Sequence, residues 1–210
     1  MVENLRVDHV IFGTVDMERT AAEILERHGL ASVVGGRHEG RGTGNRIVPL
    51  GSAYLELMGV VDEAEAANHP FGRWFTEQIS DRDRFLMWCI GTDDIDAVST
   101  RLGLEVEEWT RATPDGAILS WRLAGLEISN EHPEIPFFIQ WTVPEELHPS
   151  KARALHPNVP SGYAMITLAG DHARVQRWIG DSDLPVRFTT GKQGVVDVTI
   201  ATDRGEIALP

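Results

Sequence analysis

A regular repeat of glycines constrains the fold of this chain more than any other feature. Three times an apolar, strand-like segment runs into a glycine, and an acidic residue able to cap a helix follows it. Gly13 lies 78 residues before Gly91, and Gly91 lies 79 residues before Gly170. A period this regular predicts that one supersecondary unit is used three times. Repeated units commonly hold a ligand between them, so the repeat also indicates where a site would lie.

Each unit shows a strand, then a helix, then three more strands. In the first unit Asp16 is placed to cap the helix, and Gly29 follows its last residue, where a glycine often ends a helix. In each unit the second range is the expected helix and the other four are the expected strands. The first unit has 7–12, 17–28, 31–34, 46–50 and 53–60, and the second has 87–90, 95–102, 104–110, 117–123 and 136–142. The third has 166–169, 173–179, 186–189, 195–201 and 206–209. This predicts an α+β fold. The predicted division is a unit at 1–61, a helical connection at 62–84, a unit at 85–143, a proline-rich connection at 144–162 and a shorter unit at 163–210.

Charge and composition exclude several classes of partner. The formal net charge is −13 over 210 residues, and nucleic-acid-binding domains are normally basic, so we expect no nucleic-acid partner. The chain has neither a signal-like start nor an apolar run long enough to span a membrane. The single Cys89 lies in a strand pattern, which favours a buried structural thiol. These features predict a cytoplasmic protein without a membrane partner.

Several motifs resemble a known superfamily. They are GGRHEGRGTGNR at 35–46, YLEL at 54–57, HPFGRW at 69–74, PFFIQW at 136–141 and HPS at 148–150. Together with the repeated unit they resemble the glyoxalase-like domain family of the vicinal oxygen chelate superfamily, over about residues 5–160. The resemblance implies that two units form one cupped mixed sheet with a central cavity. A third, shorter unit follows at the C-terminus.

The resemblance also implies a set of metal ligands on the first and last strands of each unit. By position these are His9 and Glu56 in the first unit, and Met87 and Gln140 in the second. A methionine is a poor ligand for a hard or borderline cation, so the set is incomplete. A divalent zinc, nickel, iron or manganese ion held by His9 and Glu56 is one expectation. A metal-free hydrogen bond between His9 and Glu56 is the other.

The residues themselves place Glu56 inside the fold. Side chains alternate along a strand, so Tyr54, Glu56 and Met58 share one face, and Leu55 and Leu57 share the other. A carboxylate is costly to bury without a partner. We therefore predict that His9 and Glu56 face the same cavity.

The glycine-rich loop has the wrong context for a nucleotide site. A phosphate-binding loop needs a strand before it and a helix after it, whereas a strand follows this one, so no nucleotide cofactor is expected. Its polar side chains can still bind an anion or a carbonyl group. The expected ligand-binding residues of this loop are Arg37, Arg41, Thr43 and Asn45, with His38 as a third metal ligand or a general base. Gln140 and His148 complete the expected ligand-binding set. The alternative is a solvated surface hairpin.

Two further interpretations concern the second half of the chain. Proline holds His148 in an extended conformation, which could present it at the mouth of the cavity. Trp88 and Trp141 are interpreted as core residues. The third unit has an apolar face that needs a cover, either within the chain or in a homodimer.

These expectations lead to two functional hypotheses. The first is an enzyme, a lyase, isomerase or dioxygenase, acting on a small polar or carbonyl-bearing molecule. In it Glu56 is the acid/base group or metal ligand, His9 is its partner, and His38, Arg41 and Asn45 orient the substrate. The second is a metal-free protein that binds or sequesters a small molecule without catalysis.

Overall fold

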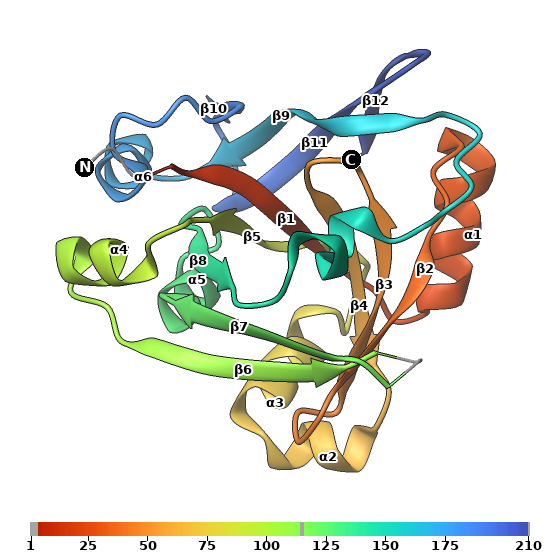
Figure 1. The fold of residues 1–210 in the computed structure, drawn as a ribbon, viewed down its shortest axis with the longest axis horizontal. Helices are drawn as coiled ribbons and strands as arrows, with labels where there is room; N and C mark the ends of the chain where they lie inside the picture. The colour runs from red at the N-terminus through yellow and green to blue at the C-terminus, as the bar shows by residue number, and fades with distance from the viewer. Residues whose placement is uncertain (1–3, 114–115, 210) are drawn as a thin grey trace.

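The strands form two sheets in a computed structural model that describes residues 4–113 and 116–209. An eight-stranded sheet has the order β2-β3-β4-β1-β5-β8-β7-β6, and a four-stranded sheet has the order β10-β9-β11-β12. Figure 1 shows the large sheet curling around the middle of the molecule, with the smaller sheet along the top. The α+β class and the cupped mixed sheet predicted from the sequence are confirmed.

Two units build the large sheet, and in each unit the last strand pairs in parallel with the first. The first unit comprises β1 (Arg6–Gly13), α1 (Met17–His28), β2 (Val33–His38), β3 (Thr43–Pro49) and β4 (Tyr54–Val60). The second comprises β5 (Arg84–Gly91), α4 (Ile95–Leu102), β6 (Val106–Ala112), β7 (Ile118–Ala124), α5 (Leu126–Glu131) and β8 (Phe137–Trp141). Helices α2 (Glu63–Asn68) and α3 (Pro70–Gln78) connect the two units.

The repeated helix signals act as the sequence predicted. Asp16 accepts a hydrogen bond from the Arg19 amide at the start of α1, and Asp94 does the same for Ala97 at the start of α4. Both helices end at a glycine in the left-handed conformation, with φ of 67° at Gly29 and 69° at Gly103.

The outer strands β2 and β6 approach each other because β2 carries glycines where they meet. A Cβ atom on Gly36 would lie 2.5 Å from Arg111 Nη1 and 2.7 Å from the Ala112 carbonyl oxygen. A side chain at that position would therefore push the two edges apart. The glycine lets the sheet curl until it nearly closes around its inner face.

The third unit repeats the order of elements but not their pairing. It comprises β9 (Pro160–Ala169), α6 (His172–Ile179), β10 (Val186–Thr189), β11 (Gly194–Thr202) and β12 (Gly205–Leu209). Its first strand pairs in parallel with β10, the next strand along the chain, whereas the last strand β12 pairs with β11. The third unit therefore repeats the expected order of elements. Its strands pair differently from those of the first two units, because its first and last strands are not neighbours.

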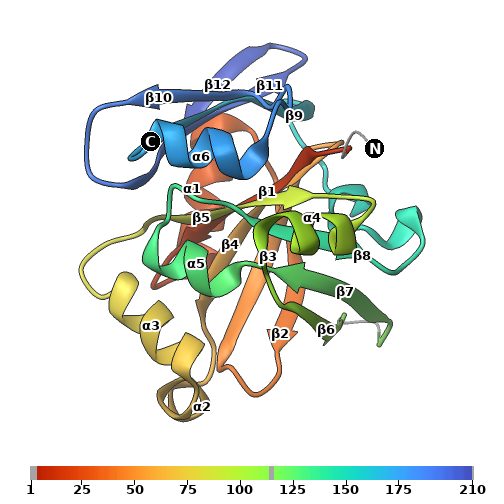
Figure 2. The ribbon, with the colours of Figure 1, turned by 90° about the vertical axis from the view of Figure 1, so that its left-hand side faces the viewer.

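The small sheet covers the outer face of the large one. Figure 2 shows it with α6 above β1 and β5. Ile166 and Val198 belong to the same buried cluster as Val10, Trp88 and Ile90 of the large sheet. The Tyr163 hydroxyl joins the sheets further, because it accepts from the Val10 amide at 3.2 Å and donates to the Tyr54 carbonyl at 2.8 Å. The apolar face of the third unit is thus covered within the chain.

The connection from β8 to β9 contains two short 3-10 helices, η1 (Glu145–Leu147) and η2 (Pro149–Lys151), and η2 packs against β3. Among the described residues no helix is long and apolar enough to cross a membrane.

Candidate active site

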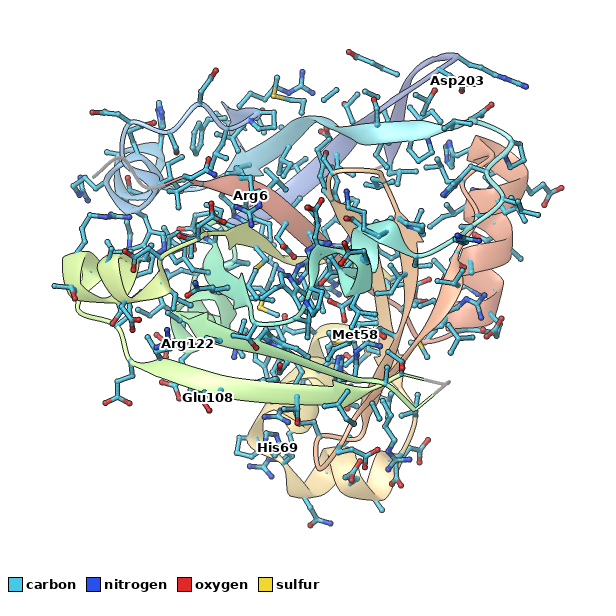
Figure 3. All side chains as sticks on the ribbon, viewed as in Figure 1. Arg6, Met58, His69, Glu108, Arg122 and Asp203 are labelled. Carbon is cyan, nitrogen blue, oxygen red and sulfur yellow. The ribbon has the colours of Figure 1, made fainter. Side chains whose placement is uncertain are left out.

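The inner face of the curled sheet lines a half-open cavity of about 60 Å³. Figure 3 shows side chains filling the inside of the curl, with the labelled Met58 among them. Its polar lining comes mainly from the first unit, as His9, His38, Asn45, Tyr54 and Glu56, joined by Arg111 of β6. Its apolar lining comes mainly from the second unit and includes Met87, Trp109, Trp121, Leu123, Leu126, Phe137, Ile139 and Trp141.

His9 is held from behind by a buried carboxylate. His9 Nδ1 lies 2.7 Å from Asp8 Oδ1, and an ionised carboxylate can only accept, so Nδ1 carries the proton and donates it. Burial opposes ionisation of Asp8, but hydrogen bonds from His148 and His9 and their positive charge hold the pKa of Asp8 well below its usual range. The ring of His9 also stacks on Tyr54, with 4.5 Å between ring centroids. These contacts fix the ring so that Nε2 faces the cavity.

Glu56 lies between two imidazoles. Its Oε2 is 3.5 Å from His9 Nε2, and its Oε1 is 3.7 Å from His38 Nε2. The predicted juxtaposition of His9 and Glu56 is present in the structure. A carboxylate oxygen and a bare imidazole nitrogen are both acceptors, so a proton or a cation must be shared between them for the contact to be favourable.

The surroundings of His38 keep it neutral. Burial, opposed by the charge of Glu56 and reinforced by Arg111 and Arg41, lowers the pKa of His38 to about 4. At neutral pH its ring can therefore accept a proton or ligate a metal. His38 Nδ1 lies 3.0 Å from the Thr43 hydroxyl, so Thr43 supports His38 and does not itself line the cavity.

Asn45 and Arg111 place hydrogen-bond donors beside the carboxylate. Asn45 Nδ2 donates to Glu56 Oε1 at 2.5 Å, and Arg111 Nη1 donates to Asn45 Oδ1 at 3.4 Å. Gly35 makes room for this contact, because a Cβ atom there would lie 2.1 Å from Asn45 Oδ1. A guanidinium has five N–H donors, so Arg111 retains donors for an oxygen atom in the cavity.

The other loop residues predicted to bind ligand lie outside the cavity. Arg37 forms ion pairs with Asp62 and Glu65 on the other side of β2. Arg41 stacks on Trp109, with its Cζ 3.5 Å from the ring centroid, and so borders the cavity without lining it.

The predicted counterpart of Glu56 in the second unit is wrong. In the first unit Gly13 pairs with Met58 and Ile11 with Glu56; in the second, Gly91 pairs with Ile139 and Cys89 with Phe137. Phe137 therefore occupies the position equivalent to Glu56. Gln140 points away from the cavity, accepting from the Ile95 amide and donating to the Asp93 carbonyl.

The alternation of side chains along β8 that excludes Gln140 also brings Trp141 to the cavity wall. There it packs against the buried apolar cluster of the inner face, so it is both a core residue and a lining residue. Trp88, in contrast, is fully buried in the core between the two sheets.

His148 lies behind His9 rather than at a mouth of the cavity. Its Nδ1 accepts from the Ser150 amide, so its Nε2 carries the proton and donates to Asp8 Oδ2 at 3.0 Å. Trp141 Nε1 donates to the same oxygen at 3.1 Å.

Sequence reasoning missed Asp8 and Arg111. Asp8 was detectable as an acidic residue inside an apolar strand and next to His9. Arg111 had no comparable signal, because only the curl of the sheet brings β6 against β2.

Glu56 lies from each of two histidines at a spacing close to that of two ligands of one metal ion. Zinc binds imidazole nitrogen and carboxylate oxygen at about 2.0–2.2 Å, so two ligands of one tetrahedral ion lie roughly 3.4 Å apart. The two distances from Glu56 to His9 and His38, 3.5 and 3.7 Å, are close to this spacing. The hydrogen bond from His9 to Asp8 is the support that metal-bound histidines usually have.

Asp8, His9 and Cys89 form a second cluster of potential ligands. Its donor atoms already share a hydrogen bond between Asp8 and His9. Burial and the charges of Asp8 and Glu56 raise the pKa of the Cys89 thiol well above its usual range, which disfavours the thiolate that a metal requires. His9, His38 and Glu56 offer the donor types that a metal prefers, but among the described residues only the donor atoms of Asp8, His9 and Cys89 all lie within 4.8 Å of one another.

A family model described as "Glyoxalase-like domain" matches residues 7–182. This chain belongs to the glyoxalase-like domain family. The resemblance to this family that the sequence motifs indicated is confirmed.

Among solved structures, the glyoxalase-like chain resembles a hypothetical protein from Staphylococcus aureus, with a TM-score of 0.70 and 20% identity over 91% of this chain and 88% of the other. This likeness supports the fold alone. Methylmalonyl-CoA epimerase from Mycobacterium tuberculosis also matches, with a TM-score of 0.47 and 16% identity over 67% of this chain and 89% of the other. A search of curated proteins found no significant match.

Proposed function

We propose that this glyoxalase-like protein is an enzyme that moves a proton next to a carbonyl group of a small molecule. The observation that carries the proposal is the buried carboxylate of Glu56 between the Nε2 atoms of His9 and His38. A carboxylate beside imidazole groups in a cavity can take up and return a proton in general acid–base catalysis.

In this proposal Glu56 removes the proton from the carbon atom next to the carbonyl. Asn45 and Arg111 stabilise the negative charge that develops on the carbonyl oxygen, because fixed donors in a water-poor site stabilise such charge strongly. The proton then passes from Glu56 to the Nε2 atom of neutral His38, 3.7 Å away, and from there to the product, so that both groups return to their starting states. Asp8 holds His9 in one tautomer, so that Nε2 faces Glu56.

A divalent metal ion would be held by His9, His38 and Glu56. When bound, it would polarise the carbonyl oxygen of the substrate. Because the second unit supplies Met87 and Phe137 at the equivalent positions, the site offers fewer protein ligands than the superfamily arrangement. Elemental analysis of the purified protein, repeated for His38→Ala, measures whether these residues retain a metal.

Proton exchange tests the function without knowledge of the natural substrate. The protein is incubated in D₂O with a panel of small carbonyl compounds, and loss of the C–H signal next to the carbonyl is followed by NMR. We expect faster exchange for part of the panel and a loss of about 100-fold or more in Glu56→Gln, the usual contribution of a general base.

Glu108→Gln is the matched control, since it makes the same change on the exposed face of β6. Compounds that bind without any exchange would contradict the proposal. They would favour the alternative, a metal-free binding protein, which the apolar residues of the second unit support.

A further inference from the structure

Three tryptophans form a continuous row along the wall of the cavity. Trp109 on β6 lies opposite Trp121 on β7, and Trp121 lies opposite Trp141 on β8. Their ring centroids are 6.5 and 5.2 Å apart along the row. All three line the cavity, and we call them the tryptophan row.

Charged or polar side chains close both ends of the row. At one end Arg41 stacks on Trp109, with 3.5 Å between Cζ and the ring centroid. At the other end the His148 ring meets Trp141 edge-on, with centroids 5.1 Å apart. Trp109 and Trp141 also donate their indole N–H groups to Glu107 and Asp8. Both rings are therefore held in fixed orientations.

The row is more than ordinary core packing. Trp121 belongs to a buried apolar cluster on the inner face of the sheet, and Trp109 and Trp141 pack against it. All three rings also border the cavity opposite the acid–base groups. Aromatic rings that border a cavity offer a flat apolar surface to a ligand.

We propose that the substrate has a flat apolar body, such as one aromatic ring, joined to an oxygen-bearing head. The proposal rests on the proposed function for the head, which lies among Glu56, His38 and Arg111. The body lies on the tryptophan row, with Phe137 and Leu123 beside it. The two units thus divide the work: the first supplies acid–base groups, and the second supplies the apolar surface.

The size of the cavity agrees with such a ligand. Its volume of about 60 Å³ exceeds the roughly 10–15 Å³ that a single water needs.

Phenylpyruvate and pyruvate are suitable probes, because they share an α-oxo acid head and differ by the ring. Binding is followed by quenching of tryptophan fluorescence and by calorimetry. We expect phenylpyruvate to bind about 50-fold more tightly than pyruvate, since the ring leaves water and stacks. Equal affinities, or no binding of phenylpyruvate, would overturn the proposal.

The variant Trp121→Leu keeps an apolar side chain and removes the central ring. We expect it to weaken phenylpyruvate binding by about tenfold, the value of an aromatic pair beyond its buried area, and to leave pyruvate unchanged. Trp178→Phe is the control, because Trp178 packs on Phe138 in the outer core. An equal loss for both probes in Trp121→Leu would show a structural role only.

The outcome is separable from that of the proposed function. Ring-dependent binding without deuterium exchange would retain the apolar subsite and reject the catalytic role of Glu56. Deuterium exchange in both pyruvate and phenylpyruvate, together with equal affinities for the two compounds, would support catalysis and reject the apolar subsite.

Discussion

Asp8 illustrates how one side chain can act through another. It accepts hydrogen bonds from His9, His148 and Trp141 and has almost no exposed surface. Its position is therefore that of a group that orients His9 and stabilises positive charge on the ring, in the way that carboxylates support metal-bound and catalytic histidines. The side chain does not line the cavity, so it is a positioning residue.

We predict that Asp8→Asn lowers the exchange activity, and the affinity for any bound metal, by about 10–100-fold, the usual effect of removing such support. An amide can donate to His9 Nδ1 as well as accept, so the tautomer of His9 loses its strong preference. The ¹⁵N chemical shifts of His9 report the tautomer directly. An unchanged tautomer with full activity would contradict the role assigned to Asp8.

His38 makes the stability of the protein depend on pH. Its pKa is lowered from 6.5 to about 4 in the folded protein, so between these values the unfolded chain binds a proton that the folded protein does not. The stabilising contribution is complete above pH 6.5 and is lost as the pH falls to 4. Asp8, whose pKa is also lowered, acts in a separate window, below its unfolded value of about 3.9.

We predict that the free energy of unfolding falls by about 3 kcal/mol between pH 6.5 and pH 4 because of His38. Urea unfolding at several pH values measures it. His38→Gln keeps a partner for Thr43 without a titrating group, and its curve should be flatter over this window. A parallel fall in both proteins would assign the pH dependence to other residues.

At the scale of elements, close packing between β2 and β3 determines the geometry of the site. Gly35 leaves space for the Asn45 side chain that donates to Glu56. The sequence predicted that this loop borders a cavity, because it carries many polar side chains on a glycine-rich backbone. The sequence could not show that these glycines leave space for the side chains of Asn45 and Arg111. It suggested instead that their backbone amides bind an anion.

We predict that Gly35→Ala destabilises the protein by about 1–3 kcal/mol, as overpacking of a filled interior does. Its exchange activity should fall to that of Asn45→Ala, since both changes displace the amide from Glu56. The double variant should recover most of the stability, because the clash is removed, but none of the activity. Additive losses of stability would show that the alanine clashes elsewhere.

The second unit shows why element order predicts a fold better than a site. Strand and helix positions followed from caps, glycines and alternation, which are local signals. Which face of the sheet Gln140 and Trp141 occupy depends instead on the register of β8 against β5. A shift of one residue in that register exchanges the two faces of a strand. The apolar cavity wall could therefore be predicted as buried surface but not as part of the site.

At the scale of the whole molecule, the third unit shares a core with the first two. Ile166 and Ile200 are fully buried in the same cluster as Val10 and Trp88. The sequence predicted an apolar face that needs a cover and left two solutions open. The structure provides the cover within the chain, so that face gives no reason to expect a homodimer.

Because one buried cluster joins the two sheets, we predict that they unfold together. Ile166→Ala should lower the free energy of unfolding by about 2–5 kcal/mol, as large-to-small changes in cores do. Its effect should reach the cavity, although Ile166 lies in the small sheet. In a Trp178→Phe background no tryptophan remains in the third unit. Circular dichroism, which reports all strands, and tryptophan fluorescence, which then reports the first two units and their connection, should show coincident urea transitions with and without Ile166→Ala. An earlier transition by circular dichroism alone would mean that the third unit unfolds independently, and that the site does not need it for stability.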